Sequence, residues 1–177
     1  GIEAAGSVEA FIKNDLYHPE RQILGEEQEG WLQQALQSSK ARGATWQVLG
    51  QQVLMGKLNI PVIPLEELAQ LELSEYARPR VEQTQQLAPY GLPSNLDAWD
   101  GYPAARERLF AMLRAQASNP ISLAGDTHNG WAFNLTNVQS EAVGVEWGTP
   151  GVSSPGLERY VPLPPERMQA LLEQIGR

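Results

Sequence analysis

The sequence predicts an α/β domain in which helices cover a mixed sheet. Segments with helical periodicity and short apolar segments follow one another in the order helix, strand, helix, three strands and helix. The composition, 42% hydrophobic and 19% charged over 177 residues, is that of a globular chain long enough to bury a core. We therefore expect residues 1–177 to belong to one domain.

The first part of the chain is predicted to supply one long helix and one buried strand. The helix begins at Gly25-Glu26-Glu27, where two carboxylates favour the positive end of the helix dipole, and Gly43 ends it. An apolar strand follows over residues 45–50 and extends loosely to Met55. Residues 1–24 carry only a weak helical pattern.

Residues 56–98 are predicted to form a long excursion. Prolines interrupt its pattern and leave short helical pieces around residues 65–71. Long irregular segments inside compact domains tend to be functional or mobile. This segment is therefore a candidate for a functional or mobile part of the molecule.

The last part of the chain is predicted to contain two helices and three strands. One helix begins at Pro103, a residue suited to a first turn, and Asn119-Pro120 stops it. The final helix begins at Pro164. The strands between these helices are expected over residues 121–124, 131–135 and 142–147.

Net charge and residue usage exclude several classes of function. The formal charge of −8 repels polyanions, so no nucleic-acid-binding patch is expected, although bound cations would still allow a phosphate ester to bind. The chain has no Cys, which excludes disulfides, thiolate metal sites and a cysteine nucleophile. No apolar run has the length of a membrane span.

The segment from Leu123 to Asn129 carries the clearest candidate for chemistry. A short strand leads through a glycine turn to Asp126 and His128, two residues apart. Ligands of open α/β sheets bind just outside such strand ends. A carboxylate and an imidazole suit a hard or borderline cation, and Asn129 adds an amide close by. Equally, Gly-Asp is a common turn and His128 fits a hydrogen-bonded loop residue.

Four other polar or aromatic residues have mainly structural interpretations. Asp100 is expected to stabilise a turn or cap a helix, and Trp99 to pack in the core or at its rim. Arg106 and Arg108 alternate with Glu107 on the predicted helix, which indicates a solvated face with ion pairs.

Five segments in order along the chain together resemble one known family. Their sequences are LGEEQEGWL (24–32), WQVLGQQVLM (46–55), WDGYPAAR (99–106), GDTHNGWA (125–132) and VEWGTPGVSSPG (145–156). These segments resemble motifs of the alkaline phosphatase D (PhoD-like) metallophosphoesterase family. The chain is similar to the C-terminal part of that family's domain.

The resemblance implies a fold and an activity. The fold would be the C-terminal half of a calcineurin-like metallophosphoesterase sandwich, with a mixed sheet and helices. The activity would be metal-dependent hydrolysis of phosphate mono- or diesters, using iron with calcium, or manganese or zinc. Asp126 and His128 match the family's late metal-ligand pair, so we expect them to be catalytic and to bind metal. Asn129, Trp131 and Gln52 are expected on the substrate side.

The family's earlier metal ligands have no counterpart in this chain. Two bound cations need more ligands than one Asp and one His. We therefore expect the missing N-terminal half of the same domain as a partner, and an inactive isolated chain. The resemblance also implies a secreted bacterial protein of the periplasm or cell exterior. The alternative function is that of a non-catalytic member that keeps the fold as a ligand-binding module.

Overall fold

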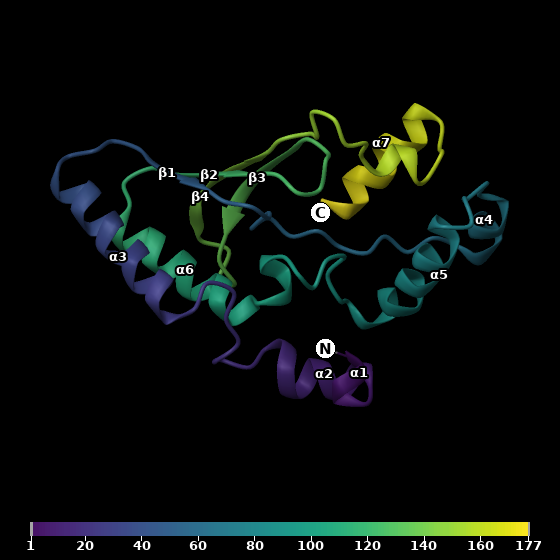
Figure 1. Ribbon diagram of the computed structural model, residues 1–177, viewed down its shortest axis with the longest axis horizontal. Coiled ribbons are helices and arrows are strands. Elements are labelled where there is room, and N and C mark those ends of the chain that lie inside the picture. Colours follow the sequence, from purple (N-terminus) through teal and green to yellow (C-terminus); the bar gives the residue numbers. More distant parts are fainter. Residues whose placement is uncertain (1, 177) are drawn as a thin grey trace.

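Four strands form one mixed sheet in the computed structural model, which describes residues 2–176 (Figure 1). The strand order is β1-β2-β4-β3, so β1 and β3 are the edges. β1, β2 and β4 are parallel, and β3 is antiparallel to β4. The strands are β1 (Gln47–Gly50), β2 (Pro120–Ala124), β3 (Trp131–Thr136) and β4 (Ala142–Gly148). The predicted α/β class with a mixed sheet is confirmed.

Two long helices, α3 (Glu26–Ala41) and α6 (Pro103–Gln116), pack together on one face of this sheet (Figure 1). Leu36 of α3 and Phe110 of α6 share a buried cluster with Leu135 of β3. Each helix begins as the sequence predicts, α3 with three acidic residues in its first turn and α6 with a proline.

The remaining helices lie outside this layer. The short N-terminal helices confirm the weak pattern before residue 24, and the C-terminal helix confirms the prediction at Pro164. They are α1 (Ile2–Ala5), α2 (Val8–Phe11), a π-helical turn (Ile12–Leu16), α4 (Leu65–Gln70), α5 (Ala77–Leu87), α7 (Pro165–Ile175) and 3-10 turns at Ala88–Tyr90, Trp99–Gly101 and Leu157–Arg159.

Two sequence predictions need correction. The predicted extension of β1 to Met55 is wrong, because the ladder ends at Gly50. Gln51 and Gln52 still bond to the backbone of Leu123 and Gly125, after which the Met55 amide donates to the Glu146 side chain. The excursion also contains a regular helix, α5, because Pro79 lies in the first turn, where its missing N–H breaks no helical bond.

The second face of the sheet carries apolar side chains in contact with solvent. Val48 on β1 is 57% exposed, Leu123 on β2 43% and Trp147 on β4 54%. Leu123 and Trp147 are register partners, so they lie side by side on this face. Parallel strands are usually covered on both faces. In this chain the helices cover only one face of the sheet, which we call the closed face. The other face is open and apolar.

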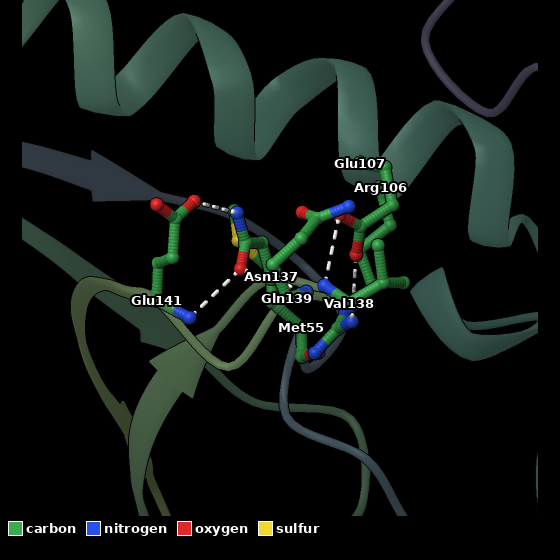
Figure 2. Close-up of polar contacts among 7 residues, drawn as sticks. All are labelled: Met55, Arg106, Glu107, Asn137, Val138, Gln139 and Glu141. Atoms are coloured by element: carbon green, nitrogen blue, oxygen red, sulfur yellow. Dashed lines mark hydrogen bonds and ion pairs between the residues drawn. The ribbon is translucent and has the colours of Figure 1, made fainter.

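The hairpin between β3 and β4 is fixed to α6 (Figure 2). The Asn137 side chain accepts the amides of Gln139 and Glu141 at 3.1 and 2.9 Å. Glu107 on α6 accepts the amide of Val138 at 3.2 Å. These bonds hold the antiparallel edge of the sheet against the helix layer.

Within residues 2–176, no helix combines the length and apolar character that crossing a membrane requires.

The close approach of β4 to the start of β2 yields a stability prediction. A Cβ added at Gly144 would lie 2.5 Å from the Pro120 carbonyl oxygen, a backbone atom that cannot turn aside. Gly144→Ala should lower the free energy of unfolding by about 1–3 kcal/mol, measured by chemical denaturation. Gly50→Ala, in a strand position with open space, is the control. Equal effects of the two substitutions would contradict this packing.

Candidate functional site

The loop of residues 125–129 joins β2 to β3 at the carboxyl ends of the parallel strands. Three backbone bonds fix it. The Gly125 amide donates to the Gln52 carbonyl at 3.1 Å, and the Gly151 amide donates to the His128 carbonyl at 3.1 Å. The Thr149 amide donates to the Ala124 carbonyl at 2.9 Å. The loop is therefore held by the segments that follow β1 and β4.

Asp126 and His128 both adopt left-handed backbone conformations. Their φ angles are 70° and 61°, in a region that few residues other than glycine occupy. Asp and His are among the residues that tolerate it best, yet the conformation still costs energy. Such strain persists where surrounding structure imposes it, and it concentrates at functional sites.

The His128 ring is oriented by one hydrogen bond. Its Nδ1 lies 3.1 Å from the Pro155 carbonyl oxygen. Because a carbonyl only accepts, Nδ1 carries the proton, and in the neutral ring Nε2 keeps its lone pair. Histidines that hold metals in proteins are oriented in this way, by a carbonyl or carboxylate on the other nitrogen. His128 is therefore prepared to offer Nε2 as a ligand.

Asp126 and His128 border different hollows. Asp126 is exposed and lines a groove of about 820 Å³ that also borders Gln52 and runs along β1. We call this hollow the β1 groove. His128 lines a second cavity, of about 490 Å³, between α5 and α7. We call it the α5–α7 cavity. The loop therefore borders two hollows: Asp126 lines the β1 groove and His128 lines the α5–α7 cavity.

Trp131 and Asn129, both predicted on the substrate side, hold the loop in place. The Trp131 Nε1–H donates to Thr127 Oγ1 at 2.9 Å, and its ring stacks on Phe133 with centroids 5.8 Å apart. Asn129 accepts the Leu157 amide at 3.1 Å and donates to Glu158 at 3.3 Å. Both ends of its amide thus connect the loop to the segment before α7.

Gln52 contributes through both its backbone and its side chain. Its carbonyl anchors Gly125, as described above, while the exposed side chain faces the β1 groove beside Asp126. Its predicted substrate contact stays a prediction. The neighbouring Gln51 points the other way, into a buried network.

Glu146 organises that network, and although it lies in the family-like segment 145–156, no role was predicted for it. Its side chain is fully buried and accepts the amides of Met55 at 2.9 Å and Gly56 at 2.7 Å. It also accepts the Ser122 hydroxyl at 2.7 Å and the Gln51 amide at 3.2 Å. Glu146 lies on the closed face, and its neighbours Val145 (half-buried) and Trp147 (exposed) lie on the other face, so strand alternation was the available signal.

Glu146 therefore supports the loop indirectly. It fixes the turn of residues 51–56, and that turn supplies the Gln52 carbonyl that holds Gly125. Gln51 extends the network, because its Oε1 accepts the Trp99 indole N–H at 2.7 Å. Trp99 is buried, as expected for a core residue.

Two further charged residues, the partly buried Asp100 and the buried Arg106, lie beside this turn. Asp100 accepts the Leu58 amide at 2.8 Å, so its role is structural, but it joins a distant segment and does not form the predicted turn or helix cap. Burial raises the pKa of the Asp100 carboxyl, although the Leu58 amide and the Arg106 guanidinium act in the opposite direction. Arg106 is 5% exposed, so its prediction as a solvated residue is wrong. The helix turns it inward, and its Nε donates to the Met55 carbonyl at 2.7 Å (Figure 2).

Arg108, by contrast, is partly exposed and forms an ion pair, as predicted for this face, although its partner at 3.3 Å is Glu29 of α3 and not Glu107 of its own helix. Burial lowers the pKa of Arg106.

Among residues 2–176, no three His, Cys, Asp or Glu side chains converge in a way that could hold a metal ion.

Comparison with known proteins gives the family. The PhoD-like phosphatase family matches residues 4–174, almost the whole chain. The chain belongs to the PhoD-like phosphatase family. This confirms the resemblance found in the five sequence segments.

A curated relative of this PhoD-like chain is alkaline phosphatase D of Bacillus subtilis (strain 168). The two are 32% identical over 144 residues, which is 78% of this chain and 20% of the relative. The chain thus spans about a fifth of that relative's length. No solved structure gives a significant match.

The buried network predicts that Glu146 is essential for stability. Glu146→Gln replaces one carboxylate oxygen by an NH₂ group, so in either orientation a donor, the Gly56 amide or the Gln51 side-chain amide, loses its acceptor. We expect the free energy of unfolding to fall by about 2 kcal/mol or more, measured by urea denaturation. Glu72→Gln, at an exposed position, is the control and should change it by less than about 0.5 kcal/mol. A similar small change in both variants would show that the network contributes little.

Proposed function

We propose that this PhoD-like chain forms part of a metal centre that hydrolyses phosphate mono- or diesters. The observation that carries the proposal is the 125–129 loop, which presents Asp126 and His128 in strained conformations at the carboxyl ends of the strands. Family membership and the name of the Bacillus subtilis relative, alkaline phosphatase D, support the reaction class. The choice between monoesters and diesters is open to assay.

The donor chemistry of the loop fits the proposed metals. The Asp126 carboxylate suits iron or calcium, and the His128 Nε2 suits iron, manganese or zinc. The bond from His128 Nδ1 to the Pro155 carbonyl supports this assignment, since in the neutral ring it leaves the lone pair on Nε2. Iron with calcium is the proposed pair, with manganese or zinc as alternatives.

When bound, such metals stabilise charge on the phosphate and lower the pKa of water. The residues of this chain have separate tasks. Asp126 and His128 hold one edge of the centre, and the Pro155 carbonyl fixes the imidazole. Trp131 supports the loop through Thr127, and the Gln52 side chain faces the β1 groove where substrate or water would approach.

We propose that further polypeptide of the same domain completes both the centre and the fold. One Asp and one His are too few ligands for two metals. The open face of the sheet exposes Val48, Leu123 and Trp147, and the β1 groove exposes Trp31 (65%) and Trp46 (59%). A second sheet on this face would give the sandwich of a calcineurin-like metallophosphoesterase. The difference in length from the relative supports such a division.

The site of action is a separate proposal. From the family resemblance alone, we propose that the longer protein acts in the periplasm or outside the cell. Detection of the protein in periplasmic and culture fractions tests this, and its confinement to the cytoplasm would contradict it.

The metal-centre proposal predicts a divided activity. The 177-residue chain alone should not hydrolyse p-nitrophenyl phosphate with added Fe³⁺ and Ca²⁺, whereas a longer polypeptide carrying the remaining ligands should. In that polypeptide, Asp126→Asn or His128→Ala should lower kcat about 100-fold or more, because each removes a metal ligand.

His18→Ala is the matched control, since His18 is exposed and its Nδ1 accepts only the nearby Glu20 amide among the described residues. Full activity of the His128→Ala variant would refute the role of His128. If the 177-residue chain alone hydrolyses the ester and His128→Ala abolishes this activity, the metal centre does not need further polypeptide and that part of the proposal is refuted.

If further polypeptide covers the open face of the sheet, one substitution there should change the free energy of unfolding differently in the short and the long polypeptide. Leu123→Lys should change the free energy of unfolding of the 177-residue chain by less than about 0.5 kcal/mol, because the side chain is exposed there. In the longer polypeptide it should cost about 2 kcal/mol or more, because a buried apolar contact is replaced by a charge.

Val152→Lys is the control, since its side chain is fully exposed and lies in the loop after β4, outside the strands. It should be neutral in both polypeptides. A dimer of the 177-residue chain that Leu123→Lys dissociates would show that a second copy covers the face and would contradict the proposal.

A further inference from the structure

We propose that the α5–α7 cavity binds the alcohol part of the phosphate ester, and that this part is apolar and aromatic. The inference rests on the proposed function, because it takes His128 as the point where the phosphate binds. It adds a substrate class to that function. The walls of the cavity include Tyr76, Arg80, His128, Tyr160, Leu171 and Ile175.

The cavity has the size and surface of a small-molecule site. Its volume of about 490 Å³ lies within the range of about 300–1,000 Å³ that is usual for ligand pockets. Leu171 and Ile175 of α7 supply aliphatic side chains on one side. Tyr76, at the start of α5, and Tyr160 supply aromatic rings whose centroids are 6.2 Å apart.

Two polar side chains of the cavity wall are already engaged with the protein. Gln85 donates to the Pro61 carbonyl and accepts the Ile63 amide, both at 2.8 Å. Thr84 donates its hydroxyl to the Arg80 carbonyl at 2.8 Å. A sugar or glycerol group would find few free partners on these side chains, whereas an apolar ring loses no hydrogen bonds when it enters.

Arg80 supplies positive charge at the aromatic wall. Its guanidinium lies 3.7 Å from the Tyr76 ring centroid, and Nη1 donates to the Tyr76 carbonyl at 2.9 Å. Within residues 2–176, Arg80 forms no ion pair. A cation without a carboxylate partner favours an anionic ligand. An aryl phosphate combines this charge with the ring that the tyrosines favour.

His128 connects the cavity to the proposed centre. It is a wall of the α5–α7 cavity, while Asp126 on the same loop borders the β1 groove. An ester whose phosphate is held at His128 therefore has the cavity available for its alcohol group. The helices α5 and α7 then determine which esters are accepted, and the loop carries the chemistry.

Binding of two non-hydrolysable probes tests the cavity directly. In NMR titrations of the 177-residue chain, 1-naphthylphosphonate should bind at least about tenfold more tightly than methylphosphonate, because burial of the ring is favourable. Tyr160→Ala or Tyr76→Ala should weaken binding of the naphthyl probe about three- to tenfold and leave methylphosphonate unchanged. Arg80→Gln should weaken both probes.

Tyr17→Ala and Arg42→Gln are matched controls at exposed positions outside the cavity, and neither should alter binding. Equal affinity of the chain for the two probes would overturn the proposal. An unchanged affinity of both tyrosine variants for the naphthyl probe would do the same.

Hydrolysis by the longer polypeptide separates this proposal from the proposed function. Tyrosine-dependent binding of the naphthyl probe without any ester hydrolysis would uphold the cavity and refute the metal centre. Hydrolysis of naphthyl and methyl phosphates with equal kcat/KM, unaffected by Tyr160→Ala, would uphold the metal centre and refute the cavity.

Discussion

The buried carboxyl group of Glu146 is the interaction on which the rest of the site depends. It receives hydrogen bonds from β2 through Ser122 and from the turn after β1 through two backbone amides. Turns after parallel strands leave amides without ladder partners, and such groups are costly when buried. A side chain acceptor delivered from β4 meets this need at the centre of the sheet. Because the same turn holds Gly125 through the Gln52 carbonyl, the position of the candidate ligands follows from a residue that never contacts them.

The division of labour in this PhoD-like chain follows the direction of its strands. Parallel β1, β2 and β4 end at the same edge, so the loops that follow them meet there and bond to one another. The excursion 56–98 and the C-terminal helix then build an apolar cavity beside that edge. The α3–α6 layer supplies the buried core, and α3 also forms one wall of the β1 groove. The α5–α7 cavity is thus built by segments other than the two helices that form the main core.

Local signals predicted much of the fold. The acidic first turn of α3 and the proline that begins α6 were visible because caps and periodicity depend on neighbouring residues. The helix at Pro79 was missed, since only position within the first turn makes a proline harmless. Glu146 and Arg106 were missed or misjudged for another reason. Charged residues are assumed to be exposed, and their burial depends on partners more than 20 residues away in sequence. For the same reason the sequence paired Asp126 with His128 but did not predict that they border separate hollows.

The left-handed backbone at residues 126 and 128 also limits how this loop can vary. Asparagine, aspartate, histidine and glycine adopt such angles most readily, while β-branched and bulky side chains are strongly disfavoured. Several of these tolerated residues are themselves good metal ligands. The backbone conformation therefore restricts which substitutions the loop tolerates. Most of the residues that preserve the loop also keep an atom that can coordinate a metal. Glycine is the main exception, because it preserves the conformation but has no such atom.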